Sequence, residues 1–534
     1  MNQFQGKEKI TVYDTTLRDG AQGEGIHFST HDKLNYLKHI EEMGSFYVEA
    51  GWPGANPRDM EFFEQIRGLH LQHVRIVAFG STCKAHESPE NSEILCKLLA
   101  SGAKTITIFG KTWDLHVRDV LRTTLKENLR IIRESISFLV SQGCEIFFDA
   151  EHFFDGFKEN PGYALKCIGT ALDAGAKIVI LCDTNGGSMP EEIAQGVMAV
   201  KEKYVPRELG IHVHNDCGLA VANTLAAVEA GVTQIQGAWN GFGERCGNAN
   251  LSTLIPLLQI KGKYTIVSDA ALLKITSFSR FVAELSNAPF DEKQPYVGRS
   301  AFAHKAGMHV DAILKNQRTF EHIDPAGVGN ERRILISDQA GKSNILERMR
   351  RFAPSICKYD PRVHKAMIEI KELEHRGYQF EAAEGSLDIL LLRILGDLNT
   401  PFEVLDYHVW SDPLRGELDS VAVVKIKVGE ETVQIASEGN GPVNALDSAL
   451  RQALKSFFPI LNRSELVNYK VRVLDGEHGT ASIVRVIIDT RLEQEVWGTI
   501  GVSKNILKAS AQALLDAINW TIYRGSNFGQ ESKC

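Results

Sequence analysis

The stretch Gly210-Ile211-His212-Val213-His214-Asn215-Asp216 places two histidines two residues apart in an apolar run. If this run is a β-strand, both imidazoles point to the same face, with their Cα atoms roughly 6.5 Å apart. Two such imidazoles at a strand end can hold one divalent metal when a third ligand comes from elsewhere. The alternative is a pair that packs or hydrogen-bonds within a polar strand face. The spacing alone leaves both interpretations open.

Seven further short apolar runs recur through residues 10–260. The expected strands are 10–13, 46–49, 74–79, 105–109, 145–148, 177–181, 210–214 and 233–237. Helix-length segments with apolar spacing of three and four lie between them, among them 32–43, 118–141 and 191–204. Several of these units end in a glycine turn, and glycine supplies the left-handed residue that closes a helix. Eight such units favour a closed parallel (β/α)8 TIM barrel. An open doubly wound sheet is the alternative, but no Gly-rich phosphate loop follows the first strand.

The composition sets limits on the class of protein. At 534 residues the chain is too long for one core, and its net charge of −8 argues against a nucleic-acid-binding surface. The nine cysteines are scattered without close pairs, which favours reduced thiols. The start MNQFQGKEKI lacks the apolar core of a signal peptide, and no stretch has the length needed to cross a bilayer. We therefore expect a cytoplasmic protein with no nucleic-acid or membrane partner.

Polar residues gather where the predicted strands end, and barrel enzymes build their sites at that rim. These residues are Asp14, Arg18, Asp19, Glu49, Asp149, Glu151, His152, Asp183, Thr184, Asn185, His212, His214, Asn240, Glu244, Arg245 and Asn248. Any one of them has a simple alternative, such as a helix cap or an exposed ion pair. Six of eight strand ends with ionisable or amide groups are harder to explain in that way.

The remaining chain divides into two parts with different patterns. Residues 271–395 lose the strict alternation and indicate a linker of small helical pieces, with His304 and His309 in an apolar segment. At this spacing the two histidines do not share a helix face, so a second two-histidine metal site is not expected. Two interpretations remain open: one of these histidines carries a proton in the reaction, or it is a buried histidine whose hydrogen bonds are satisfied.

Residues 396–534 carry an internal repeat. The run 421–428 is similar to 482–489, and 441–454 is similar to 502–517, each pair 61 residues apart. Two copies of a strand–strand–helix unit predict a pseudo-symmetric α+β module, and its lack of catalytic residue types favours a regulatory or dimerising role. The predicted domains are thus a catalytic barrel over 1–270, a linker over 271–395 and a regulatory domain over 396–534.

One aspartate oxygen, two histidine nitrogens and an amide oxygen make a mixed site that suits Zn²⁺ or Mn²⁺, and Mg²⁺ less naturally. Arg18 offers a planar fork for a carboxylate or an enolate. A metal, an arginine and a carboxylate such as Glu151 are the groups required for carbon–carbon bond chemistry on a 2-oxo acid. The residue types do not separate bond making from bond breaking.

Three segments together resemble the Claisen-condensing branch of the metallolyase barrel family, which contains 2-isopropylmalate, homocitrate and citramalate synthases. They are residues 14–20 (DTTLRDG), 212–216 (HVHND) and 241–248 (GFGERCGN). The resemblance covers nearly the whole chain, and the stretches 51–57, 109–114 and 148–156 are most similar to the citramalate synthase group. The C-terminal repeat is similar to the family's regulatory domain.

The resemblance implies a role for each residue of the site. It implies a divalent metal held by Asp19, His212, His214 and Asn248, and Arg18 as the residue that steadies the carbonyl and enolate oxygens. Thr184 would hydrogen-bond the oxo acid, and Glu151 with His309 would activate acetyl-CoA. Relatives often have a tyrosine about ten residues after the second histidine, where this chain has Thr319 and Phe320, so a phenolic contribution is in doubt.

The expected reaction joins acetyl-CoA, pyruvate and water to give citramalate and CoA, on the route to isoleucine. The alternatives are 2-oxoisovalerate as the oxo acid, a homocitrate synthase, an acyl-CoA lyase, and a non-catalytic sensor on a retired barrel. The resemblance also implies a homodimer and an amino-acid feedback effector.

Overall fold

The computed structural model describes residues 8–204, 208–337, 340–398, 400–412, 419–474, 481–493 and 495–527. The outermost residues of the predicted ranges 1–270 and 396–534 lie outside these. The chain forms two compact units. The first consists of Met1–Phe302 and Ile323–Arg332, and the second of Ala303–His322 and Arg333–Cys534. Each unit is built around its own hydrophobic core.

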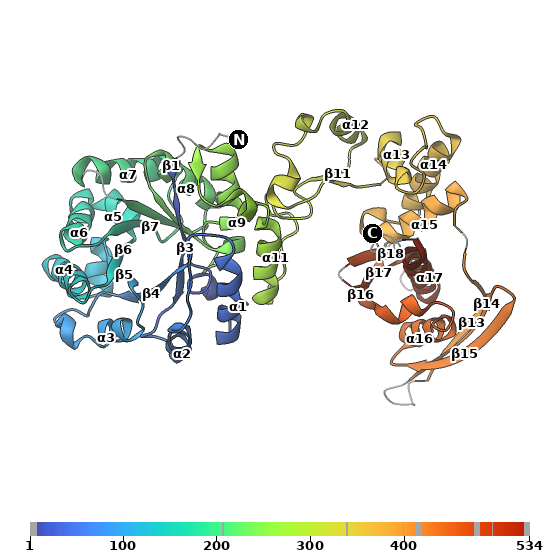
Figure 1. Ribbon diagram of the computed structural model, residues 1–534, viewed down its shortest axis with the longest axis horizontal. Coiled ribbons are helices and arrows are strands. Elements are labelled where there is room, and N and C mark those ends of the chain that lie inside the picture. The colour runs from blue at the N-terminus through green and yellow to red at the C-terminus, as the bar shows by residue number, and fades with distance from the viewer. Residues whose placement is uncertain are drawn as a thin grey trace. The chain divides into compact units, whose positions relative to one another are not determined.

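Eight parallel strands of the first unit close into a barrel, as predicted (Figure 1). They are β2 (Thr11–Asp14), β3 (Phe46–Gly51), β4 (Arg75–Ser81), β5 (Thr105–Lys111), β6 (Glu145–Glu151), β7 (Ile178–Asp183), β8 (Leu209–Val213) and β9 (Gln234–Gly237). The last strand pairs with the first, so that Gln236 lies opposite Tyr13. The barrel is therefore complete, and the carboxyl ends of all eight strands meet at one rim.

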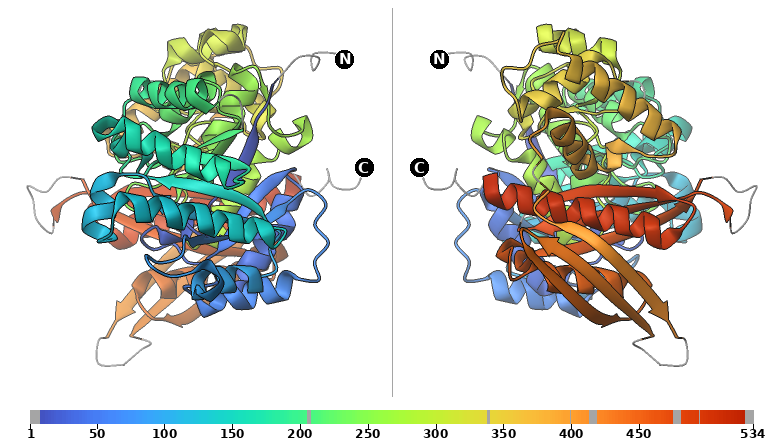
Figure 2. Two further views of the ribbon diagram at one scale, coloured as in Figure 1. Left: turned by 90° about the vertical axis from the view of Figure 1, so that its left-hand side faces the viewer. Right: turned by 90° about the vertical axis from the view of Figure 1, so that its right-hand side faces the viewer.

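Helices surround this barrel on the outside (Figure 2). They are α1 (Thr30–Glu41), α2 (Pro57–Ile66), α3 (Glu93–Ala100), α4 (Leu125–Ser141), α5 (Phe153–Glu159), α6 (Pro161–Asp173), α7 (Pro190–Tyr204) and α8 (Ala220–Glu229), followed by α9 (Leu251–Pro256), α10 (Asp269–Leu272) and α11 (Ile275–Leu285). Glycines of the predicted turns have positive φ angles, for example 82° at Gly143 and 104° at Gly175. Only glycine adopts this conformation without strain, so these glycines end the helices.

The helix predicted over residues 118–141 begins later than its apolar spacing indicated. A π-helical turn occupies His116–Val120, and α4 starts at Leu125. The physical reason is a helix cap: the Thr124 side chain accepts a hydrogen bond from the Glu127 backbone N–H at 3.1 Å. The residues before the cap form a separate turn over the barrel rim.

The barrel interior changes character along its axis. Its lower layers are apolar and aromatic, with Tyr13, Tyr47, Val77, Phe147, Ile178, Ile180 and Cys182 in one buried cluster. Successive strand residues point to opposite sides, so the residues two positions further toward the carboxyl end of each strand also point into the barrel. These positions hold polar side chains, among them Glu49, Asp149, His212 and Gln236, all buried. The packed core thus supports a polar layer at the rim.

The second unit begins with small helical pieces. They are α12 (Gly307–Lys315), α13 (Lys342–Arg350), α14 (Pro361–His375) and α15 (Glu384–Leu395), with the short strands β11 (Ala303–His304) and β12 (Arg333–Ile334) paired in parallel. Arg348 forms a two-pronged ion pair with Asp388, at 2.6 and 2.7 Å, which joins α13 to α15. Among the described residues, no helix of either unit has the length and apolar character to cross a membrane.

Two similar halves complete the second unit, as the repeat predicted. Each is a three-stranded antiparallel sheet with one helix on its face: β13 (Glu403–Ser411), β14 (Ser420–Val428), β15 (Glu431–Gly439) and α16 (Pro442–Leu454), then β16 (Ser464–Val473), β17 (Val484–Leu492), β18 (Glu495–Ser503) and α17 (Ile506–Asn527). Figure 2 shows α17 lying along its sheet. The predicted strand–strand–helix unit was therefore one strand short. The missed strands, β13 and β16, each contain a β-bulge that interrupts their alternation.

Candidate metal centre and active site

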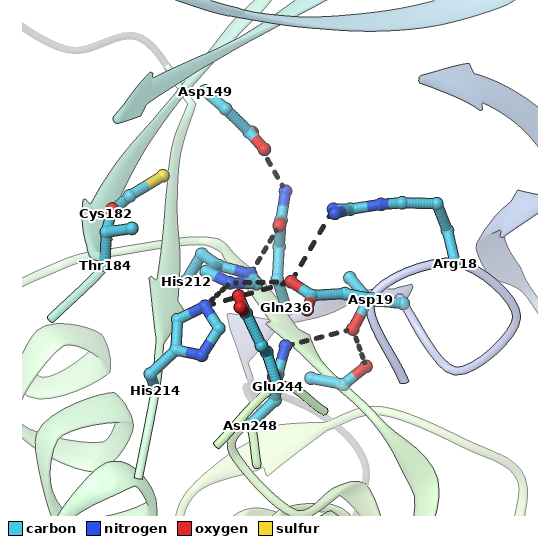
Figure 3. Close-up of polar contacts among 12 residues, drawn as sticks. Arg18, Asp19, Asp149, Cys182, Thr184, His212, His214, Gln236, Glu244 and Asn248 are labelled. Carbon is cyan, nitrogen blue, oxygen red and sulfur yellow. Dashed lines mark hydrogen bonds and ion pairs between the residues drawn. The ribbon is translucent and has the colours of Figure 1, made fainter. Parts of the chain in front are cut away.

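The structure brings Asp19, His212 and His214 together at the carboxyl rim of the barrel (Figure 3). Their ligating atoms all lie within 4.8 Å of one another. The two histidine Nε2 atoms are 3.2 Å apart, and the Asp19 Oδ2 atom lies 3.4 Å from His212 Nε2 and 3.9 Å from His214 Nε2. Two nitrogens that bind one tetrahedral Zn²⁺ at about 2.05 Å lie roughly 3.3 Å apart. The spacing of the imidazoles therefore fits a shared metal ion.

Unpartnered polar atoms surround this cluster. Within the described ranges, Asp19 Oδ1, His214 Nδ1 and Asn248 Oδ1 are buried without a hydrogen-bond partner. A buried polar atom without a partner destabilises a fold unless a ligand or ion satisfies it. Aspartate and amide oxygens with imidazole nitrogens form a donor set suited to Zn²⁺ or Mn²⁺. The residues present thus fit a divalent cation.

Asn248 reaches this place through its own local structure. It forms an isolated β-bridge with His214, and its Nδ2 atom lies 3.5 Å from Thr15 Oγ1. The chain folds back over it at Gly243, where φ is 152° and a Cβ atom would lie 2.0 Å from Asn248 Oδ1. Any larger residue at 243 would displace the amide. The glycine in the predicted motif is therefore a steric requirement of the site.

Electrostatics tie the three ligand candidates together. Although burial raises the pKa of Asp19, the neighbouring Arg18 and the two histidines lower it well below its ordinary value. Burial lowers the pKa of His212, but the hydrogen bond and charge of Asp19 raise it overall. Burial and the charge of His212 lower the pKa of His214 to about 4. Asp19 is thus an anion and His214 a neutral ring at pH 7, the states that bind a metal.

Arg18 lies beside the cluster and is anchored from below. Its Nε atom donates to Glu49 Oε2 at 2.5 Å, and its guanidinium lies 3.7 Å from the centre of the Phe79 ring. The Glu49 side chain is fully buried, and its other oxygen accepts a hydrogen bond from the Tyr13 hydroxyl at 2.8 Å. Burial opposes the charge of Arg18, yet Glu49 and Asp19 raise its pKa. Of the other guanidinium nitrogens, Nη2 lies 3.6 Å from Asp19 Oδ2, beyond hydrogen-bond distance, so both Nη atoms can still donate to a bound anion.

Thr184 and Glu151 occupy neighbouring strand ends. The Thr184 hydroxyl oxygen accepts the backbone N–H of His152 at 2.9 Å, which leaves its proton for another acceptor. Glu151 forms an ion pair with Lys111, its register neighbour on β5. His152 adopts a left-handed conformation, with φ of 56°, between these two groups. Such strain in a non-glycine residue is concentrated at functional sites.

His309 belongs to the second unit. It lies in α12, where its ring stacks on Phe320 at 4.1 Å with an interplanar angle of 25°. His304, the other histidine of this segment, accepts or donates a hydrogen bond at 3.2 Å with the buried Glu321. Of the two histidines, His309 is thus the exposed one. Phe320 is 48% exposed and carries no hydroxyl, so it offers a ring surface and no proton.

Sequence reasoning missed two groups in this site. Gln236 bridges His212 and Asp149 beneath the cluster, and Lys111 pairs with Glu151. Both lie on the inward face of their strands, two residues from other inward positions, so strand alternation carried a signal for them. Their hydrogen-bond partners depend on the stagger between strands, which residue spacing within one strand does not reveal.

Family models match most of the chain. The model of the HMGL-like family matches residues 9–282. The chain belongs to the HMGL-like family. Two further models match the rest of the chain: the Homocitrate synthase post-HMGL domain-like model over residues 296–377, and the LeuA allosteric (dimerisation) domain over residues 381–522.

Individual relatives match nearly the full length of the chain. An (R)-citramalate synthase of Geobacter sulfurreducens is 46% identical over 98% of this chain and 99% of its own length. An (R)-citramalate synthase of a Synechocystis species is 46% identical over 96% of each chain. A 2-isopropylmalate synthase of Heliobacterium modesticaldum is 28% identical over 97% of this chain and 98% of its own.

Proposed function

We propose that this chain is an (R)-citramalate synthase, an acyltransferase that condenses acetyl-CoA with pyruvate and water to give (R)-citramalate and CoA. The observation that carries the proposal is the level of identity with known enzymes. Five (R)-citramalate synthases are 42–46% identical to this chain, while the 2-isopropylmalate synthases are 28% identical. Arg18, Asp19, His212, His214 and Asn248 are all present, which argues against a retired barrel.

Asp19, His212, His214 and Asn248 would hold a divalent cation, either Zn²⁺, Mn²⁺ or Mg²⁺. When bound, this ion supplies Lewis acidity toward the keto group of the oxo acid. Arg18 donates hydrogen bonds to the oxygens of pyruvate, because its Glu49-bound side leaves the rest of the fork for an anion. The Thr184 hydroxyl donates a hydrogen bond to the pyruvate carboxylate, because its oxygen already accepts one from the His152 backbone. These contacts orient the electrophilic carbon.

Glu151, assisted by His309, would accept a proton from the methyl group of acetyl-CoA. The resulting carbanion carbon bonds to the keto carbon of pyruvate, whose oxygen then takes up a proton. Water hydrolyses the thioester and releases CoA with a free thiol. Lys111 forms an ion pair with Glu151 in the structure and so holds the side chain of the proposed base in place.

Aromatic side chains form one wall beside Arg18. Phe79 and Phe109 stack at 5.5 Å, and the edge of Trp52 meets both rings at 5.8 and 5.7 Å. We infer pyruvate as the oxo acid from the higher identity to (R)-citramalate synthases than to 2-isopropylmalate synthases.

The other parts of the proposal concern assembly and control. We infer three domains, a catalytic barrel (1–270), a linker (271–395) and a regulatory domain (396–534), in a cytoplasmic homodimer that an amino acid of the isoleucine route inhibits. Exposed apolar groups support the dimer. Tyr469 and Val471 pair with buried Ile488 and Val486 on the face that carries α17, yet they are 36% and 42% exposed. A second copy would cover them.

A free-thiol assay across pyruvate, 2-oxobutanoate, 2-oxoisovalerate and 2-oxoglutarate tests the function. We expect the highest kcat/KM with pyruvate, dependence on an added divalent cation, and (R)-citramalate as the product. Glu151→Gln is the matched control, because it keeps the shape of the side chain and removes the base. A preference for 2-oxoisovalerate would contradict the assignment to citramalate synthesis, and thiol release without an oxo acid would indicate a hydrolase.

A further inference from the structure

A buried amide, that of Gln236, connects the candidate metal centre to the carboxylate of Asp149 (Figure 3). The Oε1 atom of Gln236 lies 3.0 Å from His212 Nδ1, and its Nε2 atom donates to Asp149 Oδ1 at 3.4 Å. Gln236 is fully buried, and His212 and Asp149 are each 5% exposed. The three side chains come from three strands, β9, β8 and β6, and all point into the barrel. They form a continuous row of hydrogen-bonded side chains that is buried from solvent.

The orientation of the Gln236 amide determines which nitrogen of His212 carries the hydrogen. The NH₂ end of Gln236 faces the Asp149 oxygen, so the carbonyl end faces the imidazole. A carbonyl oxygen only accepts hydrogen bonds, and the Nδ1 atom opposite it must therefore be the donor. In a neutral imidazole the Nε2 atom then has a lone pair, and this atom points toward Asp19 and His214.

His214 provides an internal comparison. Its Nδ1 atom is buried and has no hydrogen-bond partner in the part of the chain that the structure describes. The outer nitrogen of His214 thus has no hydrogen bond to direct the ring, while that of His212 has one. Hydrogen bonds of this kind fix the tautomer and ring orientation of a metal-binding histidine.

We propose that Gln236, held in its orientation by Asp149, is a positioning residue that keeps His212 in the Nδ1–H tautomer and directs its Nε2 atom toward a divalent cation. The proposal rests on the metal centre of the proposed function. It extends that function by assigning a role to two buried residues that touch neither the substrate nor the ion.

Titration of chelator-treated full-length protein with Mn²⁺ alone tests this role. Gln236→Leu keeps the approximate volume and removes both hydrogen bonds, so we expect Mn²⁺ affinity to fall about 10- to 100-fold. Gln234→Leu is the matched control. Gln234 is also fully buried, points inward from the same strand two residues earlier, and neither of its amide atoms has a partner in the described structure. We expect Gln234→Leu to bind Mn²⁺ like the parent protein.

A reversed pair separates positioning from packing. In the double variant Gln236→Glu/Asp149→Asn, the new carboxylate accepts the His212 Nδ1–H bond and the new amide donates to that carboxylate. We expect this variant to recover Mn²⁺ affinity to within a few-fold of the parent. In the single variant Gln236→Glu, the new carboxylate would face the Asp149 carboxylate. We expect this variant to bind Mn²⁺ more weakly than the double variant.

The tautomer can also be observed without metal. Nitrogen-15 NMR of histidine-labelled protein at pH 8, with His212→Gln to assign the signal, should show Nδ1–H for His212 in the parent and a mixture in Gln236→Leu. Parent-like affinity of Gln236→Leu, or equal losses in Gln236→Leu and Gln234→Leu, would overturn the proposal. A fixed tautomer in a parent protein that binds no divalent cation would instead refute the proposed function and leave the positioning intact.

Discussion

The buried ion pair between Arg18 and Glu49 gives a prediction that separates folding from catalysis. Arg18 is 12% exposed at its side chain and Glu49 is fully buried, with 2.5 Å between the Nε and Oε2 atoms. In the variant Arg18→Met the methionine retains contact with Phe79, but Glu49 keeps only the hydrogen bond from Tyr13. Removal of one partner of a buried pair destabilises a protein by about 3–5 kcal/mol. We expect a loss of that size in the unfolding of the barrel.

The double variant Arg18→Met/Glu49→Gln removes both charges. The amide carbonyl introduced at position 49 still accepts the hydrogen bond from Tyr13, so no charge is left at position 49. Asp19 keeps the two histidines as neighbours in both variants. We expect its free energy of unfolding to return to within about 1 kcal/mol of the parent protein. Its activity should stay as low as that of Arg18→Met, because neither variant has a fork for the substrate carboxylate.

Urea denaturation followed by tryptophan fluorescence measures the stability, and release of CoA thiol measures the activity. A destabilisation of Arg18→Met by less than about 1 kcal/mol would show that Glu49 is solvated or protonated, and the argument from burial would fail. A double variant no more stable than Arg18→Met would also contradict the reasoning. Recovery of activity in the double variant would remove Arg18 from the proposed substrate contacts.

Further predictions concern the metal, the regulatory domain, pH and the proposed base. His212→Ala should lose activity together with bound metal, which elemental analysis measures. Arg18→Lys should be as inactive as Arg18→Met, since a point charge cannot replace the planar fork. Removal of residues 401–534 should abolish inhibition by isoleucine more than turnover; a truncated enzyme that still responds would contradict the regulatory assignment. Burial raises the pKa of Asp14 from 3.8 to about 6. The stability of the protein relative to Asp14→Asn should therefore be greatest below pH 4 and fall by about 3 kcal/mol as the pH rises through 6. Denaturation curves from pH 4 to 7.5 measure this difference, and parallel pH profiles for the two proteins would refute it. Lys111→Met should lower kcat, because Glu151 loses the ion pair that holds its side chain in place; an unchanged kcat would remove Lys111 from the support of the proposed base.

The barrel was predictable because its signals are local. Each strand is an apolar run, several strands follow a glycine turn, and those turn glycines have the positive φ angles that their positions required. His212 and His214 share a face because strand alternation demands it, and the structure places their Nε2 atoms 3.2 Å apart. That Asp19 joins them followed from barrel closure, since β2 and β8 both pair with β9.

The features that the sequence concealed depend on irregular backbone or on stagger between strands. In β13 the register shifts between Val404 and Asp406, and in β16 between Leu466 and Asn468, so a period of two does not run through either strand. Half-exposed edge strands also lack the continuous apolar run of a buried strand. The partnership of Lys111 with Glu151 joins residues 40 positions apart, and only the register of β5 on β6 sets them side by side.

The fold itself supports the side chains of the proposed metal centre. Asp14 accepts hydrogen bonds from Thr16 and Tyr36 and so fixes the loop that leads to Asp19. The β-bridge to His214 fixes Asn248, and Gln236 fixes His212. None of these contacts uses an atom proposed to face the ion. Asp19 Oδ1 and Asn248 Oδ1, which are proposed to face the ion, are left without partners in the described structure. Because the fold has already ordered the donors, a cation that enters needs to supply little of the ordering itself, and more of its interaction energy is available as affinity.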